Sequence, residues 1–229
     1  MPPWLRMRVG ERDARFTALM SAENLYRRIR RVLSRTSLRL GLVEAPAGGE
    51  GFAAGEDVTL FVTTIGDQEN FADCLARLRA QTLPAPIDII DHVAPMSAAF
   101  QEMHARCRTD YYVQVDEDMI LFPHAIETLS GWMRSAPANV AMICAPLWDC
   151  DAKRAIYGLK IYRSSIVKRF PYRNTLSCEI AQLAEIEGAG YRVILRPLGD
   201  RSGCLGEHGK HYHPGTIFRR CTRRWRSRM

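Results

Sequence analysis

The stretch Val113-Gln114-Val115-Asp116-Glu117-Asp118-Met119-Ile120-Leu121 carries the strongest indication of the fold in this chain. Three carboxylates interrupt a run of valine, isoleucine and leucine, residue types that favour a buried β-strand. Charges at such a position are costly unless a positive group compensates them. In an extended segment Asp116 and Asp118 would point to the same side, because strand side chains alternate. Two such oxygen ligands suit Mg²⁺ or Mn²⁺ with positions left for phosphate oxygens; a solvated acidic turn is the simpler alternative.

Strand-like and helical segments alternate on both sides of this stretch. The sequence predicts strands at 58–64, 87–90, 111–115, 140–144 and 191–195, an irregular strand pair near 155–162, and helices at 70–80, 97–107, 123–133 and 177–188. This order predicts a Rossmann-like α/β fold, with a mostly parallel sheet flanked by helices on both faces. Ligands of such sheets bind at the carboxyl ends of the strands, where Asp91 and the acidic triplet fall. The sequence contains neither the Gly-x-Gly-x-x-Gly fingerprint after its first strand nor a P-loop signature.

The distribution of charge divides the 229 residues into an acidic middle and two basic ends. Residues 1–40 contain ten arginines and three acidic residues, and residues 209–229 contain seven Lys or Arg and no acidic residue. We expect a basic helical appendage at 1–45, a flexible linker at 46–57, one main domain at 58–213 and a basic tail at 214–229. Basic ends indicate contact with an anionic membrane surface, with nucleic acid or with phosphate groups.

The cysteines and the first residues indicate the cellular compartment of the protein. The seven cysteines are scattered without a Cys-x-x-Cys pair, which is typical of a reducing compartment. The first residues lack the apolar core of a secretory signal. We therefore expect a cytoplasmic protein that can lie peripherally at the inner face of a membrane.

Four short segments, in this order, resemble the nucleotide-diphospho-sugar transferases with the GT-A fold, and among them glycosyltransferase family 2. They are the first strand with Thr63-Thr64, the pair Gln81-Thr82 before the second strand, the strand end Ile89-Ile90-Asp91, and Tyr111–Asp118, which is similar to the family's strand ending in Asp-x-Asp. The chain departs from the family at His92-Val93-Ala94, where the usual sequence is Asp-Gly-Ser.

The resemblance implies a glycosyltransferase that moves a sugar from a nucleotide-diphosphate donor to a hydroxyl acceptor, such as a glycan or a lipid-linked group, with inversion. It implies that Asp116 and Asp118 bind Mn²⁺ or Mg²⁺, which neutralises the leaving diphosphate. It also places Thr63, Thr64, Asp91 and Asp116 against the nucleotide. Lys210 can hold phosphate oxygens.

An inverting transfer needs a base for the acceptor hydroxyl. Glu179, near the start of the helix at 177–188, matches the position of the family's base, although an acid in a first helical turn is also favourable for the helix dipole alone. Asp149 and Asp151 are rivals for the base or for sugar contacts.

The late histidines offer a further metal ligand, because related enzymes often place a late histidine on the metal and Mn²⁺ accepts imidazole beside carboxylates. The candidates are His208, His211 and His213. A structural zinc site built from these histidines with Cys204 and Cys221 is an alternative, although the spacing is irregular.

Two other functions remain open at this point. A nucleotidyltransferase acting on a sugar phosphate would share the sheet, but its Gly-rich, Arg-containing loop after the first strand is matched poorly by residues 63–68. A non-enzymatic basic module would bind membrane or nucleic acid through the ends and would not need Asp118. The glycosyltransferase hypothesis expects no nucleic acid partner.

Overall fold

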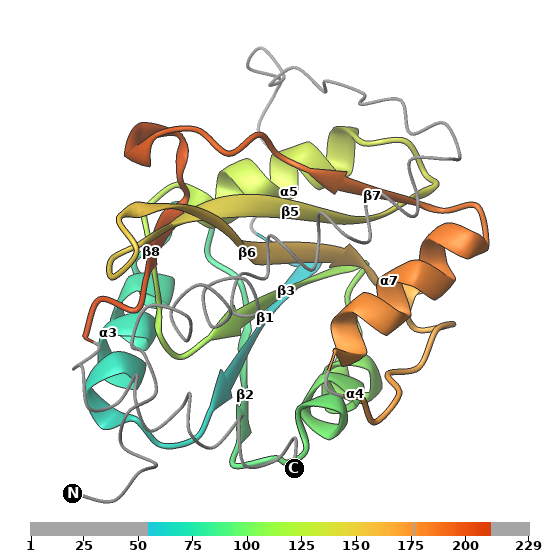
Figure 1. Cartoon of the computed structure of the whole chain (residues 1–229), viewed down its shortest axis with the longest axis horizontal. Helices are drawn as coiled ribbons and strands as arrows, with labels where there is room; N and C mark the ends of the chain where they lie inside the picture. Colours follow the sequence, from blue (N-terminus) through green and yellow to red (C-terminus); the bar gives the residue numbers. More distant parts are fainter. Residues whose placement is uncertain (1–54, 176, 212–229) are drawn as a thin grey trace, which may run out of the picture. The chain divides into compact units, whose positions relative to one another are not determined.

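The computed structural model describes residues 55–175 and 177–211, so the predicted appendage at 1–45, most of the linker, His213 and the tail at 214–229 lie outside the described residues. Within the described part, eight strands form one mixed sheet in the order β2-β1-β3-β6-β5-β8-β4, and β7 pairs with β5 outside this path (Figure 1). The predicted α/β fold with a mostly parallel sheet and flanking helices is confirmed.

The first half of the sheet follows the sequence prediction within one or two residues at most boundaries. Strand β1 (Val58–Thr64) pairs in parallel with β2 (Ile87–Asp91) on one side and with β3 (Tyr111–Asp116) on the other. The connections are the helices α3 (Gln68–Arg79) and α4 (Met96–Arg106). Parallel neighbours need such crossovers, and their carboxyl ends therefore meet at one edge of the sheet.

The second half is more irregular. Strand β5 (Val140–Asp149) continues beyond the predicted end at 144 and forms an antiparallel hairpin with β6 (Arg154–Arg163), which in turn pairs with β3. The sequence did not predict β4 (Met119–Leu121) or β8 (Gly206–His208). The remaining elements are α5 (Ala125–Ser135), α6 (Ser164–Val167), α7 (Cys178–Gly188), β7 (Arg192–Leu195) and the short helix η2 (Arg201–Gly203).

The helices cover both faces of the sheet because successive strand side chains point to opposite sides. On one face α4 and α7 pack against a buried cluster of apolar and aromatic side chains, whose largest members are Phe61, Phe100, Tyr112, Tyr162 and Tyr172. On the other face α3 lies against β4, and α5 lies against β5 and β6 (Figure 1). The two helical layers hold the sheet between them and leave the strand ends at the edge where the charged residues gather.

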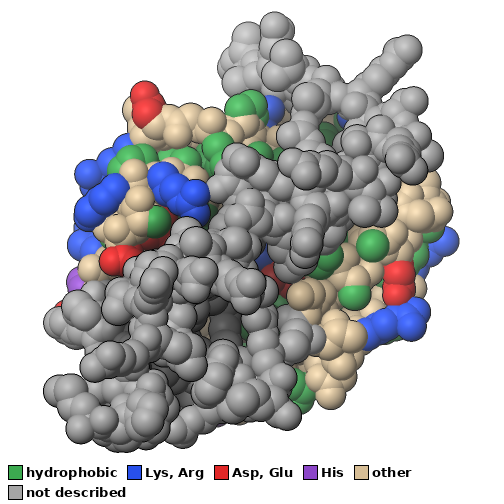
Figure 2. Space-filling model, viewed as in Figure 1, with side chains coloured by type: hydrophobic (Ala, Val, Ile, Leu, Met, Phe, Trp, Pro, Cys, Tyr) green, Lys and Arg blue, Asp and Glu red, His purple; other side chains and the backbone are tan. Residues whose placement is uncertain are grey.

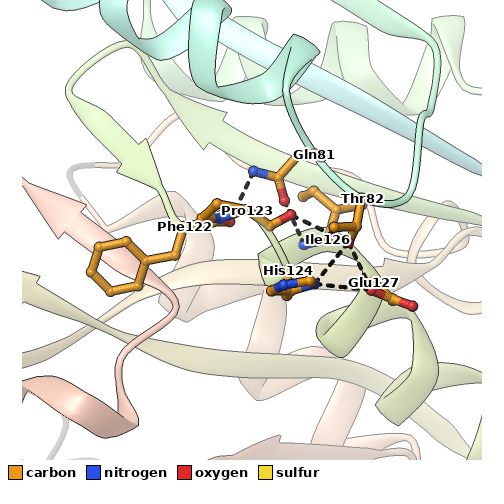
Figure 3. Close-up of polar contacts among 7 residues, drawn as sticks. All are labelled: Gln81, Thr82, Phe122, Pro123, His124, Ile126 and Glu127. Atoms are coloured by element: carbon orange, nitrogen blue, oxygen red, sulfur yellow. Dashed lines mark hydrogen bonds and ion pairs between the residues drawn. The ribbon is translucent and has the colours of Figure 1, made fainter.

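A buried glutamine joins the end of α3 to the start of α5 (Figure 3). Gln81 Nε2 donates to the carbonyl oxygens of Phe122 at 2.9 Å and of Arg77 at 3.1 Å, and its Oε1 accepts from Ile126 N at 3.0 Å. Ile126 lies in the first turn of α5, where backbone N–H groups have no partner within the helix. The Gln81 side chain therefore supplies a cap that His124, the residue preceding the helix, does not provide.

The described residues contain 16 Lys and Arg and 20 Asp and Glu, so this part of the protein is net acidic. Figure 2 shows basic and acidic side chains intermixed over the described part of the face in view, with hydrophobic ones in small groups. No helix within residues 55–175 and 177–211 has the length and apolar character needed to cross a membrane.

Candidate active site

The carboxyl ends of β2, β1 and β3 bring the predicted nucleotide-side residues together. Thr64 of β1 is in register with Asp91 of β2, and Thr63 is in register with Asp116 of β3. The Thr63 hydroxyl donates to Asp116 Oδ1 at 2.7 Å. The expected meeting of Asp91 and the acidic triplet at one edge of the sheet is therefore observed, with β1 between them.

Asp91 lies at the open rim of this edge. Its Oδ1 is 2.5 Å from His92 Nδ1, and both side chains are more than half exposed. His92 adopts a left-handed backbone conformation with φ of 53° and donates its backbone N–H to Thr64 O. Its ring lies over Gly66, where an added Cβ would approach to 2.9 Å. These contacts hold the loops after β1 and β2 against each other.

Glu117, the middle residue of the triplet, has a different role from its neighbours. Its side chain is buried, and Oε2 accepts from the Thr64 hydroxyl at 2.5 Å, from Asp67 N at 3.2 Å and from Ile65 N at 3.3 Å. One carboxylate oxygen therefore orders the whole loop between β1 and α3. Sequence reasoning missed this role, because it treated residues 116–118 as one extended segment, whereas Glu117 lies in a turn.

The chain leaves the extended conformation after Asp116, and residues 117–118 form a turn before β4. Strand alternation therefore does not set the direction of the Asp118 side chain, contrary to the expectation from sequence. Asp118 still acts on its neighbour: burial and the negative charge of Asp118 raise the pKa of Asp116 above its ordinary value. Lys160 and the Thr63 hydroxyl oppose this shift.

Strand β8 inserts His208 beside the acidic turn. It pairs with β4 through Met119↔His208 and with β5 through Asp149↔His208. His208 Nε2 lies 3.6 Å from Asp118 Oδ2, and Nδ1 lies 3.5 Å from Asp149 Oδ2. Of the late histidines considered from sequence, His208 is the one that contacts Asp118 among the described residues.

The charges around His208 favour its positive form. Burial alone lowers the pKa of His208, but the interaction with Asp149 and the charges of Asp118 and Asp116 outweigh burial and raise it. Burial likewise raises the pKa of Asp149, while His208 and the backbone N–H groups of the following turn outweigh that effect and lower it. The centre therefore contains carboxylates that a cation stabilises.

Glu179 lies in the first turn of α7 and reaches the same face of the sheet as Asp116. Its Oε1 is 2.6 Å from Lys160 Nζ of β6, and both side chains are mostly buried. Burial lowers the pKa of Lys160, but the charges of Glu179, Cys144 and Asp116 outweigh burial and raise it. The Lys160 ammonium therefore interacts with both the candidate base and Asp116. From sequence this residue was placed only within an irregular strand pair, with no role at the site.

Two other candidate residues point elsewhere. His211 Nε2 lies 3.0 Å from Asp73 and its Nδ1 lies 3.4 Å from Glu69, both on α3. Lys210 Nζ also faces Asp73, at 3.6 Å. These contacts hold the segment after β8 against α3, beside an open depression of about 470 Å³ lined by Glu69, Ala72, Asp73, Ala76 and His211.

The donor atoms of Asp118 and His208 have the separation that a divalent cation requires of two of its ligands. Bonds of about 2.1 Å at angles of about 90–120° place two ligand atoms about 3.0–3.6 Å apart, and the Asp118–His208 separation of 3.6 Å fits. Within residues 55–211, excluding 176, no three His, Cys, Asp or Glu side chains form a metal-binding group. Two protein donors are what Mg²⁺ or Mn²⁺ needs when a diphosphate and water complete its shell, whereas a structural zinc site needs four.

The fold of this chain is similar to that of several solved structures, whereas its sequence has no match. The chain matches no protein-family model. It also matches no curated protein. It is similar to the solved structure of glucosyl-3-phosphoglycerate synthase from Mycobacterium tuberculosis in complex with Mg²⁺ and uridine diphosphate, with a TM-score of 0.52, 12% identity, and coverage of 72% of this chain and 74% of that one.

A second similar structure is the mannosyltransferase PcManGT from Pyrobaculum calidifontis in complex with GDP-Man and Mn²⁺, with a TM-score of 0.51 and 12% identity. The match covers 62% of this chain and 55% of that one, so this chain spans about half the length of the mannosyltransferase. The chain has a GT-A-type fold. At these identities the similarity is one of fold, and within the GT-A fold the acidic turn after β3 occupies the carboxyl edge of the sheet.

Proposed function

We propose that this protein is a glycosyltransferase that moves a sugar from a nucleotide-diphosphate donor to a hydroxyl acceptor, with inversion and with the help of Mn²⁺ or Mg²⁺. The observation that carries the proposal is the meeting of Asp118 and His208, which are far apart in the sequence, 3.6 Å apart at the carboxyl edge of a GT-A-type sheet. A carboxylate and an imidazole at this separation suit one cation, and the GT-A fold is shared by structures that contain Mg²⁺ or Mn²⁺ with a nucleotide.

The proposed role of each residue follows from its position at the edge of the sheet. Asp118 and His208 would hold the cation, which supplies positive charge to the leaving diphosphate. Asp116, fixed by the Thr63 hydroxyl, would face the nucleotide, and Asp91 would contact its base at the exposed rim. The loop that Glu117 orders includes Thr64, so that the nucleotide would meet a rigid backbone.

Glu179 is the favoured base for the acceptor hydroxyl. The Lys160 ammonium lies 2.6 Å from Glu179 Oε1 and would hold this carboxylate in place to receive the proton of the acceptor. Asp149 is less suited to this role, because one of its oxygens accepts from two backbone N–H groups and the other faces His208. The acceptor, whether a glycan or a lipid-linked hydroxyl, would approach from the side of Glu179.

The location of the protein belongs to the same proposal. The six cysteines within the described residues are free thiols, which is typical of a cytoplasmic protein. The basic residues at 1–40 and 209–229 would draw it to an anionic membrane surface.

The test is the Asp118→Asn variant, assayed for nucleotide release and sugar transfer with UDP-sugars and GDP-sugars in the presence of Mn²⁺. Loss of a metal ligand removes several kcal/mol of stabilisation from the transition state, which is about a hundredfold or more in rate. Asp110→Asn is the matched control, because Asp110 is an exposed carboxylate just before β3, at the opposite end of that strand from the acidic turn. An unchanged rate in Asp118→Asn, with the control active, would retire the proposal.

A further inference from the structure

The Asp149 carboxylate at the end of β5 makes two different sets of contacts. Its Oδ1 accepts from Ala152 N at 2.7 Å and from Asp151 N at 3.0 Å, which fixes the turn between β5 and β6. Its Oδ2 faces His208 Nδ1 at 3.5 Å. The side chain is 19% exposed, so the turn holds this carboxylate in one orientation against the imidazole.

The imidazole of His208 is flanked by carboxylates on both sides. Nδ1 faces Asp149 and Nε2 faces Asp118, and the ring is 25% exposed. Its backbone is fixed as well, because the His208 carbonyl accepts from Cys150 N at 3.0 Å and the next residue, Gly209, donates to Asp118 O at 3.1 Å. The ring therefore spans from the β5–β6 turn to the acidic turn.

A neutral imidazole carries one proton, and the group facing each nitrogen decides which nitrogen holds it. Carboxylates face both nitrogens of His208, but Nδ1 is shielded from solvent and the carboxylate beside it, Asp149, is held in place by the turn. We propose that Asp149 is a positioning residue that keeps the proton of His208 on Nδ1, so that the bare Nε2 faces the cation position beside Asp118. The inference rests on the proposed function, in which Asp118 and His208 share that cation. Carboxylates that orient a metal-binding histidine in this way typically contribute tenfold to hundredfold in metal affinity.

The Asp149→Asn variant separates this role from that of the turn. The asparagine side-chain oxygen can still accept from the N–H groups of Asp151 and Ala152, since Asn and Asp form the same turn. Its NH₂ group then faces His208 Nδ1 and favours the tautomer with the proton on Nε2. That tautomer has no lone pair to offer beside Asp118. Asp110→Asn serves as the control, because its side chain is exposed and lies at the opposite end of β3 from the acidic turn.

The first readout is Mn²⁺ affinity in the presence of UDP or GDP, measured from the electron paramagnetic resonance signal of free Mn²⁺. We expect Asp149→Asn to bind Mn²⁺ about tenfold to hundredfold more weakly than the wild type, and Asp110→Asn to bind it equally well. Equal affinity in Asp149→Asn and in the wild type would overturn the inference and leave the proposed function standing.

The second readout needs no metal. The ring ¹⁵N shifts of His208, measured at about pH 9 where histidine is neutral, report the tautomer directly. We expect the Nδ1–H form in the wild type and the Nε2–H form in Asp149→Asn. An Nε2–H form in the wild type overturns the inference even if the variant does not fold. A wild type that binds no Mn²⁺ with either nucleotide, yet shows the Nδ1–H form, refutes the proposed function and upholds the orientation of His208 by Asp149.

Discussion

The Gln81→Leu substitution tests how the end of α3 is joined to the start of α5. Gln81 is 6% exposed, so leucine keeps the volume and removes only the polar contacts. The Phe122 carbonyl also accepts from Ala125 N at 3.0 Å and keeps one partner. Ile126 N loses its bond to Oε1 and is left buried without a protein acceptor in the first turn of α5.

The expected loss in the free energy of unfolding follows from these contacts. A buried donor left without a partner costs about 2 kcal/mol, and the two lost bonds to carbonyls add up to about 1 kcal/mol each, with relaxation reducing the sum. We expect Gln81→Leu to lower the free energy of unfolding by about 3 kcal/mol. The control is Thr82→Ala in the same cluster (Figure 3), because the Thr82 bond to Glu127 is exposed and is worth about 0.5 kcal/mol.

Urea denaturation followed by circular dichroism measures both variants. The change in Gln81→Leu should appear in the midpoint with an unchanged slope, since the area exposed on unfolding is the same. If Gln81→Leu is no less stable than Thr82→Ala, the account of the α3–α5 brace is wrong.

Three further predictions concern buried charges. Burial, with the charge of Lys168, lowers the pKa of His104 to about 4. The unfolded chain takes up this proton first as pH falls, so the free energy of unfolding should increase by up to about 3 kcal/mol as pH is raised from about 4 to 6.5. Urea titrations of the wild type and of His104→Gln should therefore differ in that pH range. Glu117→Ala should speed amide hydrogen exchange at Ile65 and Asp67 and cost about 2–3 kcal/mol; unchanged exchange at both amides would contradict its role in the loop. Glu179→Gln should lower turnover by about a hundredfold or more with little change in donor affinity, and a loss of donor binding instead would assign Glu179 another role.

Much of the fold could be predicted from local sequence. The runs at 58–64, 87–91 and 111–116 are rich in β-branched and aromatic residues and alternate with helices, so each element is indicated by its own residues. Parallel pairing then brings their carboxyl ends together whatever the details, and this is why Asp91 and Asp116 could be placed at one edge in advance.

The short strands could not be predicted in this way. β4 and β8 have three residues each, too few for a periodic pattern, and they pair with each other across 84 or more residues of chain. Their pairing decides which late histidine meets Asp118, and it selects His208, while His211 turns to Asp73 on α3. Sequence alone treated these histidines as equivalent.

The sequence by itself therefore determined the order of the elements and the acidic end of β3, because propensity and periodicity are local properties of the chain. Only the tertiary structure decided the partners of each charge: Thr64 for Glu117, Lys160 for Glu179, and Asp118 with Asp149 for His208. The physical reason is that a buried charge is stabilised by whatever the register of distant strands places against it, and that register is set by the packing of the whole sheet.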